Sequence, residues 1–200
     1  FRKTNETFVS VMARLATIDE AQKKIESLTG SVVNLQELLG DKRARGAFGE
    51  VQLEGLVRNI LPASAFEMQC TLPNGARADC VLELPPPTGR VAVDSKFPLE
   101  NYHRMFAAEA SELERAGAQK QFRHDLRRHI DAISSKYIIA GVTSDGAVMF
   151  VPAEAVFAEI HARHRDVVDY AQKKCVWLTS PTTLMAVLTT ALSVIRSVET

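Results

Sequence analysis

The chain has 200 residues, of which 46% are hydrophobic and 24% are charged, a balance typical of a folded globular domain and not of a disordered chain. Lysine and arginine together number 24, and so do aspartate and glutamate, so any contact with nucleic acid must come from local clusters of basic residues. The cysteines, Cys70, Cys80 and Cys175, form no C-x-x-C pattern, which argues against zinc and predicts reduced, buried thiols in a cytosolic protein. Because no uninterrupted apolar run reaches the ~18 residues of a membrane-spanning helix, we expect neither a membrane span nor a signal peptide in this sequence.

The first 40 residues predict a helical arm with a coiled-coil seam. Apolar residues recur at alternating spacings of three and four from Phe8 to Ile25, with Gln22 as the polar seam position. After a one-residue slip the seam continues to Leu39. A coiled coil predicts self-association into a homo-oligomer. A seam this short is also compatible with a helix that packs on its own domain, and both interpretations stay open.

A charged segment between two glycines, Gly40 and Gly46, predicts the boundary to a second domain over residues 41–200. Apolar spacing and turn signals predict strands at residues 66–72, 77–84, 90–95, 148–151 and 176–179. They predict helices at residues 48–60, 99–108, 111–137 and 153–171, and a last helix from Pro181 with Ser180 as its N-cap. This order is that of an α/β protein with a mixed sheet flanked by helices. Trp177 is expected in its core.

The predicted strand within Arg90–Leu99 ends by placing Asp94 and Lys96 two residues apart, so that both side chains point to the same face. Asp79 lies in the preceding strand, and Glu50 in the first turn of the helix before it. Carboxylates that converge at one sheet edge would bind Mg2+, which would polarise a phosphodiester oxygen and acidify a bound water. Lys96 would stabilise the developing charge. The pattern therefore predicts hydrolysis of a nucleic-acid backbone.

The alternative for Asp94 and Lys96 is an ordinary ion pair at a strand end, which stabilises a protein by less than about 1 kcal/mol when exposed. Geometry separates the two interpretations. If Leu84 pairs with Arg90 around a loop of five residues, Asp79 and Asp94 lie on opposite faces of the sheet. A loop of four or six residues, or a bulge, places them on one face. The hydrolysis hypothesis predicts the even loop or the bulge.

Five short blocks extend the D…D-x-K pattern over most of residues 45–190. They are G-A-F-G-E at 46–50 followed by V-Q-L-E, R-A-D at 77–79, V-D-S-K-F-P-L-E at 93–100 with Tyr102 after it, M-F-V-P-A-E at 149–154, and S-P-T-T-L-M-A at 180–186. These blocks resemble the RmuC family of DNA recombination proteins, within the PD-(D/E)xK nuclease superfamily. Ala78 stands where the superfamily usually has proline, and Ser95 where the family often has alanine, and neither change removes a functional group.

The resemblance implies a restriction-endonuclease-like core behind an N-terminal coiled coil over residues 1–40. It implies a Mg2+-dependent DNA endo- or exonuclease, with Mn2+ as a substitute, that acts in recombination or on unusual DNA structures. By position, Glu50, Asp79 and Asp94 would hold the metal, and Lys96 would be the catalytic lysine. No small-molecule cofactor is expected. The protein is expected in the cytoplasm, with any inner-membrane anchor upstream of Phe1.

Basic residues near the predicted site are candidates for DNA contact. They are Lys42, Arg43 and Arg45 beside the site, and Lys120, Arg123, Arg127 and Arg128 on the helix over residues 111–137. A solvated helix face is the ordinary alternative there, because Asp125 and Asp131 dilute the charge. For the whole chain, the alternative to an enzyme is an inactive nuclease-fold scaffold that binds DNA or protein through the coil and the basic helix. The complete acidic set with Lys96 favours the enzyme, whereas the neutral net charge favours the scaffold.

Overall fold

Five strands form one sheet in the part of the chain that the structure, a computed structural model, describes, residues 41–199. They are β1 (Phe66–Thr71), β2 (Arg77–Glu83), β3 (Arg90–Ser95), β4 (Ala147–Phe150) and β5 (Val176–Thr179), in that spatial order. The pairs β1–β2 and β2–β3 are antiparallel, whereas β3–β4 and β4–β5 are parallel. The predicted mixed α/β sheet is therefore confirmed, and the strand ends agree with the prediction to within one residue.

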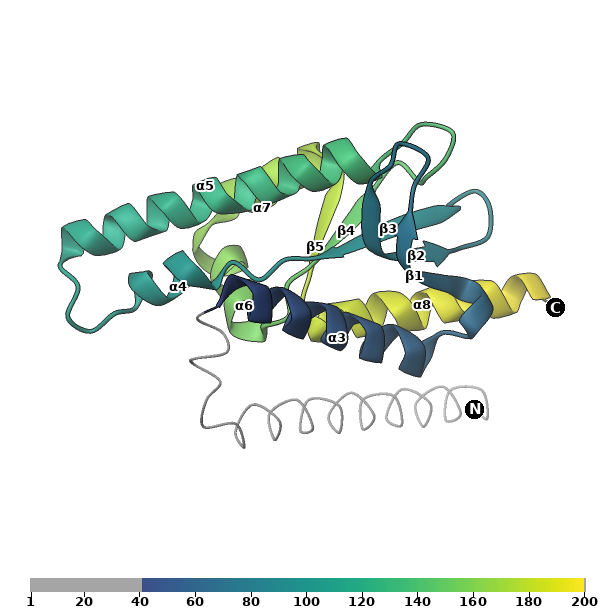
Figure 1. Cartoon of the computed structure of the whole chain (residues 1–200), viewed down its shortest axis with the longest axis horizontal. Helices are drawn as coiled ribbons and strands as arrows, with labels where there is room; N and C mark the ends of the chain where they lie inside the picture. Colours follow the sequence, from purple (N-terminus) through teal and green to yellow (C-terminus); the bar gives the residue numbers. More distant parts are fainter. Residues whose placement is uncertain (1–40, 200) are drawn as a thin grey trace, which may run out of the picture. The chain divides into compact units, whose positions relative to one another are not determined.

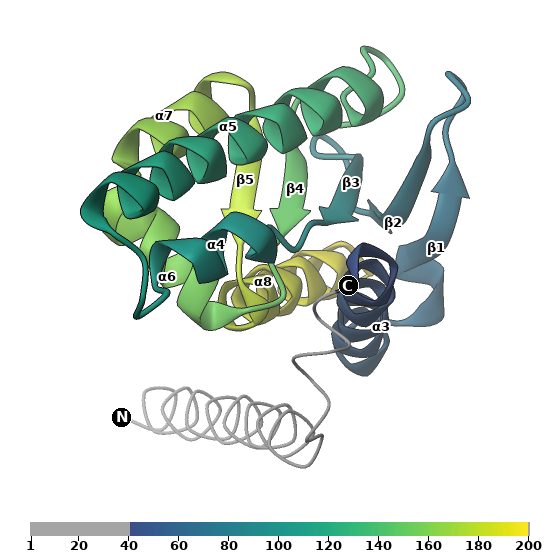
Figure 2. The same ribbon diagram turned by 60° about the vertical axis from the view of Figure 1, so that its left-hand side comes forward.

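Helices cover both faces of the sheet (Figures 1 and 2). They are α3 (Lys42–Ile60), α4 (Leu99–Met105), α5 (Glu112–Tyr137), α6 (Glu154–Arg163), α7 (Arg165–Lys173) and α8 (Pro181–Glu199), with a short 3-10 helix at Ala63–Ala65. In Figure 1, α5 and α7 lie on one side of the sheet, and α3 and α8 lie side by side on the other. The chain divides into two compact units, residues 1–41 and 42–200. The predicted heptad seam lies outside the described residues.

The hairpin between β1 and β2 and the long helix α5 show how local sequence sets these elements. Gly75 adopts a φ of +84°, and the Ala76 amide donates to the Asn74 side-chain oxygen at 3.0 Å, as the Asn-Gly turn signal predicts. At the start of α5, Ser111 and Glu114 form a reciprocal capping box. The apolar residues of α5 then recur every three or four positions, and this stripe is buried against the sheet: Ala118, Phe122, Leu126, Ile130, Ile133 and Tyr137.

Several expectations from the sequence are wrong. The helix predicted at residues 48–60 begins earlier, at Lys42, so the charged segment around Arg43 is part of α3 and does not interrupt the helix. The helix predicted over residues 153–171 is two helices, α6 and α7, which are separated at His164 by a non-helical backbone with φ −125° and ψ 52°. Trp177 is 54% exposed, and Cys175 is also exposed, whereas the other two cysteines are buried as expected. Both exposed residues belong to or adjoin β5, which is an edge strand of the sheet.

Helix α8 is long and apolar enough to cross a membrane by length and composition, with a mean hydropathy of 1.3. In the structure it runs beside α3, and its inner face is buried in the domain through Leu184, Met185 and Leu188. Only 28% of the apolar window is buried in this way, and Val187, Val194 and Val198 on the same helix are exposed.

Candidate active site

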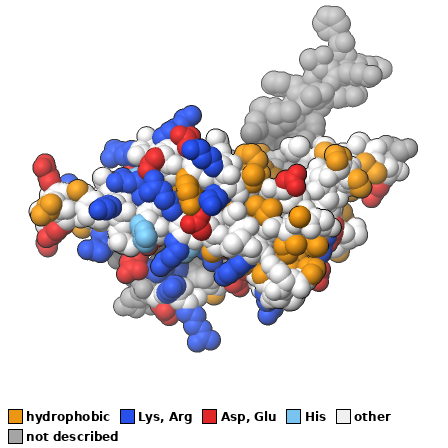
Figure 3. All heavy atoms as spheres, turned by 90° about the horizontal axis from the view of Figure 1, so that it is seen from above, with side chains coloured by type: hydrophobic (Ala, Val, Ile, Leu, Met, Phe, Trp, Pro, Cys, Tyr) orange, Lys and Arg blue, Asp and Glu red, His pale blue; other side chains and the backbone are white. Residues whose placement is uncertain are grey.

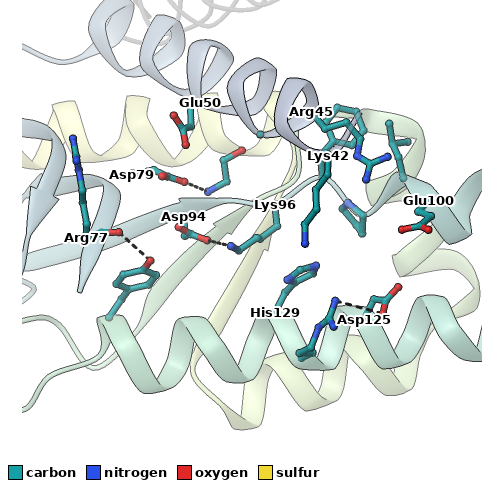
Figure 4. Close-up of a pocket in the computed structure, with 17 residues that line it drawn as sticks. Lys42, Arg45, Glu50, Arg77, Asp79, Asp94, Lys96, Glu100, Asp125 and His129 are labelled. Carbon is teal, nitrogen blue, oxygen red and sulfur yellow. Dashed lines mark hydrogen bonds and ion pairs between the residues drawn. The ribbon is translucent and has the colours of Figure 1, made fainter. Parts of the chain in front are cut away.

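A cleft of about 380 Å3 lies beside the carboxyl-terminal end of β3. Its walls come from the first half of α3, the start of β2, residues 94–100, and α5 (Figure 4). Because β2 runs antiparallel to β3, the start of β2 lies next to the end of β3. The four residues predicted to be catalytic, Glu50, Asp79, Asp94 and Lys96, all line this cleft.

The register between β2 and β3 places the two aspartates together. The connecting loop has six residues, 84–89, so the prediction of an even loop is confirmed. Cys80 pairs with Val93, and one step further along the same ladder Asp79 lies opposite Asp94. The Asp79 carboxylate also accepts a hydrogen bond of 2.8 Å from the Ser95 backbone amide. Both aspartates therefore lie on one face at the end of the sheet.

The two carboxyl groups disturb each other electrostatically. Burial, followed by the negative charge of Asp94, raises the pKa of Asp79 to about 7, whereas the hydrogen bond from Ser95 acts in the opposite direction. Burial and the same two carboxylates also raise the pKa of Tyr137, whose hydroxyl donates to the Arg77 carbonyl at 3.1 Å. A pair of carboxylates this close favours a cation between them, because a cation relieves their repulsion.

Lys96 pairs with Asp94 at 3.2 Å between Nζ and Oδ2. The Asp94 side chain is only 5% exposed, and the Lys96 side chain is 34% exposed, so this is not the surface ion pair of the alternative interpretation. Asp94 Oδ2 is buried, and apart from this ion pair it accepts no hydrogen bond from the described residues. An acceptor oxygen without a hydrogen-bond donor is suited to a further positive ligand.

A close approach of α3 to the end of β3 brings Glu50 to the cleft. Gly49 is buried, and a Cβ atom at this position would overlap Ser95 Oγ, so the absence of a side chain permits the contact. Glu50 follows on the exposed side of α3, and its charge contributes to the raised pKa of Asp79. Because α3 begins at Lys42, Glu50 lies inside the helix, and the helix dipole at a first turn does not explain its presence.

The carboxylates fit a hard cation as an incomplete ligand set. Mg2+ prefers carboxylate oxygens and commonly takes one or two of them together with waters, and Asp79 with Asp94 meets that requirement. Within residues 41–199, no three or more Asp, Glu, His or Cys side chains are close enough to form a complete metal cluster. Glu50 therefore lines the same cleft without closing a three-carboxylate site.

The other end of the cleft is basic. Lys42 and Arg45 reach it from α3, and Arg128 and His129 reach it from α5 (Figure 4). Burial, followed by the positive charges of Lys96, Arg128 and Lys42, lowers the pKa of His129 to about 4, while Asp125 acts in the opposite direction. His129 is therefore neutral at physiological pH.

Only part of the predicted DNA-binding set lines this cleft. Lys42, Arg45 and Arg128 do, whereas Arg43, Lys120, Arg123 and Arg127 do not. Arg127 instead pairs with Asp166 of α7 at 2.7 Å. Figure 3 shows Lys and Arg side chains gathered over the side of the molecule formed by α5 and α7.

Sequence reasoning missed the contribution of α5 to the cleft. His129 and Asp125 were not considered as site residues, and Tyr137 was assigned only to the apolar stripe. The available signal was helical spacing, because positions four apart, such as Asp125 and His129, share one helix face. That signal identifies a shared face but not what the face packs against, which depends on the crossover from β3 to β4.

The fold and the site define an α/β domain with a carboxylate pair and a lysine at the end of a central strand. Residues 1–200 match the RmuC family, so the chain belongs to this family, and the expected family membership is confirmed. No solved structure matches the chain.

Relatives of the chain carry the name DNA recombination protein RmuC or its homolog. The homolog of Vibrio cholerae is 31% identical over 198 residues, which cover 94% of this chain and 37% of the relative. The Escherichia coli K12 protein is 30% identical over 196 residues, which cover 86% of this chain and 40% of the relative. The Salmonella typhimurium protein is 28% identical over 204 residues, which cover 94% of this chain and 42% of the relative. This chain therefore spans about two fifths of the length of these relatives.

Proposed function

We propose that this domain is a Mg2+-dependent DNA nuclease of the PD-(D/E)xK type, with a restriction-endonuclease-like core, that acts in recombination or on unusual DNA structures. The observation that carries the proposal is the register that sets Asp79 opposite Asp94, with Lys96 paired to Asp94 at 3.2 Å. The names of the relatives, DNA recombination proteins, support the biological process.

The three carboxylates, Lys96 and Tyr137 each have a role in this proposal. Asp79 and Asp94 would hold Mg2+, or Mn2+ as a substitute, with Glu50 as a third carboxylate in the same cleft. The bound metal would polarise the phosphodiester and lower the pKa of the attacking water. Lys96 would stabilise negative charge that develops on the phosphate, and its pairing with Asp94 fixes it on the correct strand face. The Tyr137 hydroxyl, which the Arg77 carbonyl orients, would help to position the carboxylates.

The second candidate function is a nuclease-fold scaffold that binds DNA without cutting it. It is favoured by the absence of a complete three-ligand cluster among residues 41–199. Its basic residues would then act through phosphate contacts alone. The two candidates differ in one measurable property, which is whether a phosphodiester bond is broken.

The test is incubation of the purified chain with linear, nicked and branched DNA in Mg2+ or Mn2+, and then in EDTA. We expect cleavage that requires the metal, that Asp94→Asn abolishes and that Lys96→Gln strongly slows. The matched controls Asp169→Asn and Lys173→Gln change the same residue types at exposed positions of α7 and should cut like the wild type. An uncleaved substrate with the wild type would exclude the nuclease and leave the scaffold. Equal cleavage by all four variants would exclude Asp94 and Lys96 as the site of hydrolysis.

A further inference from the structure

The basic end of the cleft, defined here as Lys42, Arg128 and His129, has no part in the hydrolysis proposed above. Lys42 is the first residue of α3, and the other two are neighbours on α5. In Figure 4, Lys42 and His129 point toward one another across the cleft, with Lys96 between this end and the aspartates. Segments far apart in the sequence thus bring cationic and donor groups together at a second location in the same cleft.

The charges at this end are only partly neutralised by the carboxylates beside it. Asp125 is the acidic residue on the same helix face, and its two oxygens are shared among three neighbours. Asn101 donates to it at 2.6 Å, Gln121 donates at 3.1 Å, and Arg128 lies at 3.7 Å. Glu100 also lines the cleft here. The lowered pKa of His129, caused by burial and then by three neighbouring cations, agrees with a local excess of positive charge.

We propose that the basic end of the cleft binds the terminal phosphate of a DNA strand. This phosphate is a different group from the phosphodiester that is cleaved in the same strand. The ammonium of Lys42 and the guanidinium of Arg128 are charged hydrogen-bond donors suited to phosphate oxygens. A neutral imidazole at His129 adds one further N–H donor. The proposal rests on the nuclease function proposed above, and it names DNA ends as the substrate class.

Two observations favour a terminal phosphate over an internal one. A terminal phosphomonoester carries a charge of about −1.5 to −2 at pH 7, whereas an internal diester carries about −1, so the two cations Lys42 and Arg128 attract the monoester more strongly. Lys42 and His129 also face each other across this end of the cleft, and a strand that continued through it would have to pass between them. A strand that ends there meets no such obstacle.

The experiment compares three versions of one fluorescent single-stranded oligonucleotide, with a 5′-phosphate, a 3′-phosphate or no terminal phosphate. Anisotropy in EDTA measures the affinity of the full chain for each without cleavage. We expect one phosphorylated version to bind about tenfold tighter than the version without phosphate, the effect of one good charge-assisted contact. Lys42→Ala and Arg128→Ala should each lose most of that preference, and His129→Gln should reduce it less.

Matched controls are Lys173→Ala and Arg165→Ala, which remove the same charges from exposed positions of α7 outside the cleft. They should keep the preference for the phosphorylated end. Equal affinity of the wild type for all three oligonucleotides would overturn the proposal, and so would an equal loss of preference in the controls. The measurement contains no cleavage step. A chain that binds phosphorylated ends but never cuts would therefore contradict the nuclease function alone, and a chain that cuts without preferring such ends would contradict this inference alone.

Discussion

Each end of the cleft brings like charges together: carboxylates at the end that holds Asp79 and Asp94, the acidic end, and cations at the basic end. At the acidic end, burial and the charge of Asp94 raise the pKa of Asp79 to about 7. At the basic end, burial and three cations lower the pKa of His129 to about 4. In each case the neutral form is favoured, because the fold places like charges together in a partly dry site.

This arrangement costs stability at both ends, and groups that are unfavourable for folding are typical of functional sites. The difference between the ends lies in what would relieve the repulsion. A metal cation would relieve it at the carboxylates, and an anion such as phosphate would relieve it at the cations. Lys96 lies between them, paired with Asp94 on one side and acting on His129 on the other. Changes at the two ends should therefore affect different measurements.

The largest expected effect is on catalysis at the acidic end. Lys96→Gln should lower kcat by on the order of 10²–10³-fold, since it removes a charge that stabilises the transition state. Arg128→Ala, at the basic end, should change KM more than kcat because it affects only binding. Single-turnover cleavage of end-phosphorylated DNA would measure both. If Arg128→Ala lowered kcat as much as Lys96→Gln, the division of roles between the two ends would be wrong.

The next largest effect is on the free energy of unfolding, when a substitution removes the negative charge of Asp79. The folded-state pKa of Asp79, about 7, lies above the ordinary aspartate value of 3.8, so the folded chain binds more protons between these values and loses stability as the pH rises through them. Above pH 7 the loss is complete. Asp79→Asn should therefore raise the free energy of unfolding by about 2 kcal/mol at pH 8 in EDTA, while it abolishes cleavage.

Urea denaturation at pH 4.5 and pH 8 is the measurement for Asp79→Asn. The exposed Asp169→Asn should change the stability by less than about 0.5 kcal/mol at either pH. A destabilised Asp79→Asn variant at pH 8 would mean that the hydrogen bond from Ser95 outweighs the repulsion from Asp94.

At the basic end the pH dependence should have the opposite sign. The folded-state pKa of His129, about 4, lies below the ordinary histidine value of 6.5, so the unfolded chain binds more protons in this range. Stability is complete above pH 6.5 and is lost as the pH falls toward 4, by up to about 2 kcal/mol after allowance for partial exposure. His129→Gln should flatten this part of the profile, whereas His124→Gln, an exposed histidine on the same helix, should leave it unchanged.

Much of the fold could be predicted because its signals are local. The strands were predicted from apolar runs and from turn residues such as Asn74-Gly75, and α5 from the helical spacing of its apolar residues. The failures depend on tertiary context. The run of lysine, arginine and alanine around Arg43 was interpreted as a break, although these residues have high helix propensity. Trp177 was assigned to the core because sequence does not reveal that β5 is an edge strand.

The candidate site divides in the same way. Asp79, Asp94 and Lys96 could be placed together from two strands and a loop length, because register propagates by simple alternation. His129 could not, since its place in the cleft depends on how α5 packs back across the sheet after β3. The close approach of α3 at Gly49 could not be predicted either, because a glycine in a helix does not indicate which residue it will contact.

That close approach gives the smallest expected effect and the finest test of the acidic end. Gly49→Ala favours the helix by up to about 1 kcal/mol through propensity, but its Cβ would overlap Ser95 Oγ. We expect the overlap to outweigh the propensity, with a net loss of about 1 kcal/mol of stability and several-fold lower cleavage as Glu50 shifts away from the aspartates. Ser95→Ala removes the hydroxyl, so the double variant should recover both properties. Gly55→Ala, in the same helix where a Cβ meets no atom within 4 Å, should only stabilise. If Gly49→Ala behaved like Gly55→Ala, the contact between α3 and β3 would not set the geometry of the acidic end.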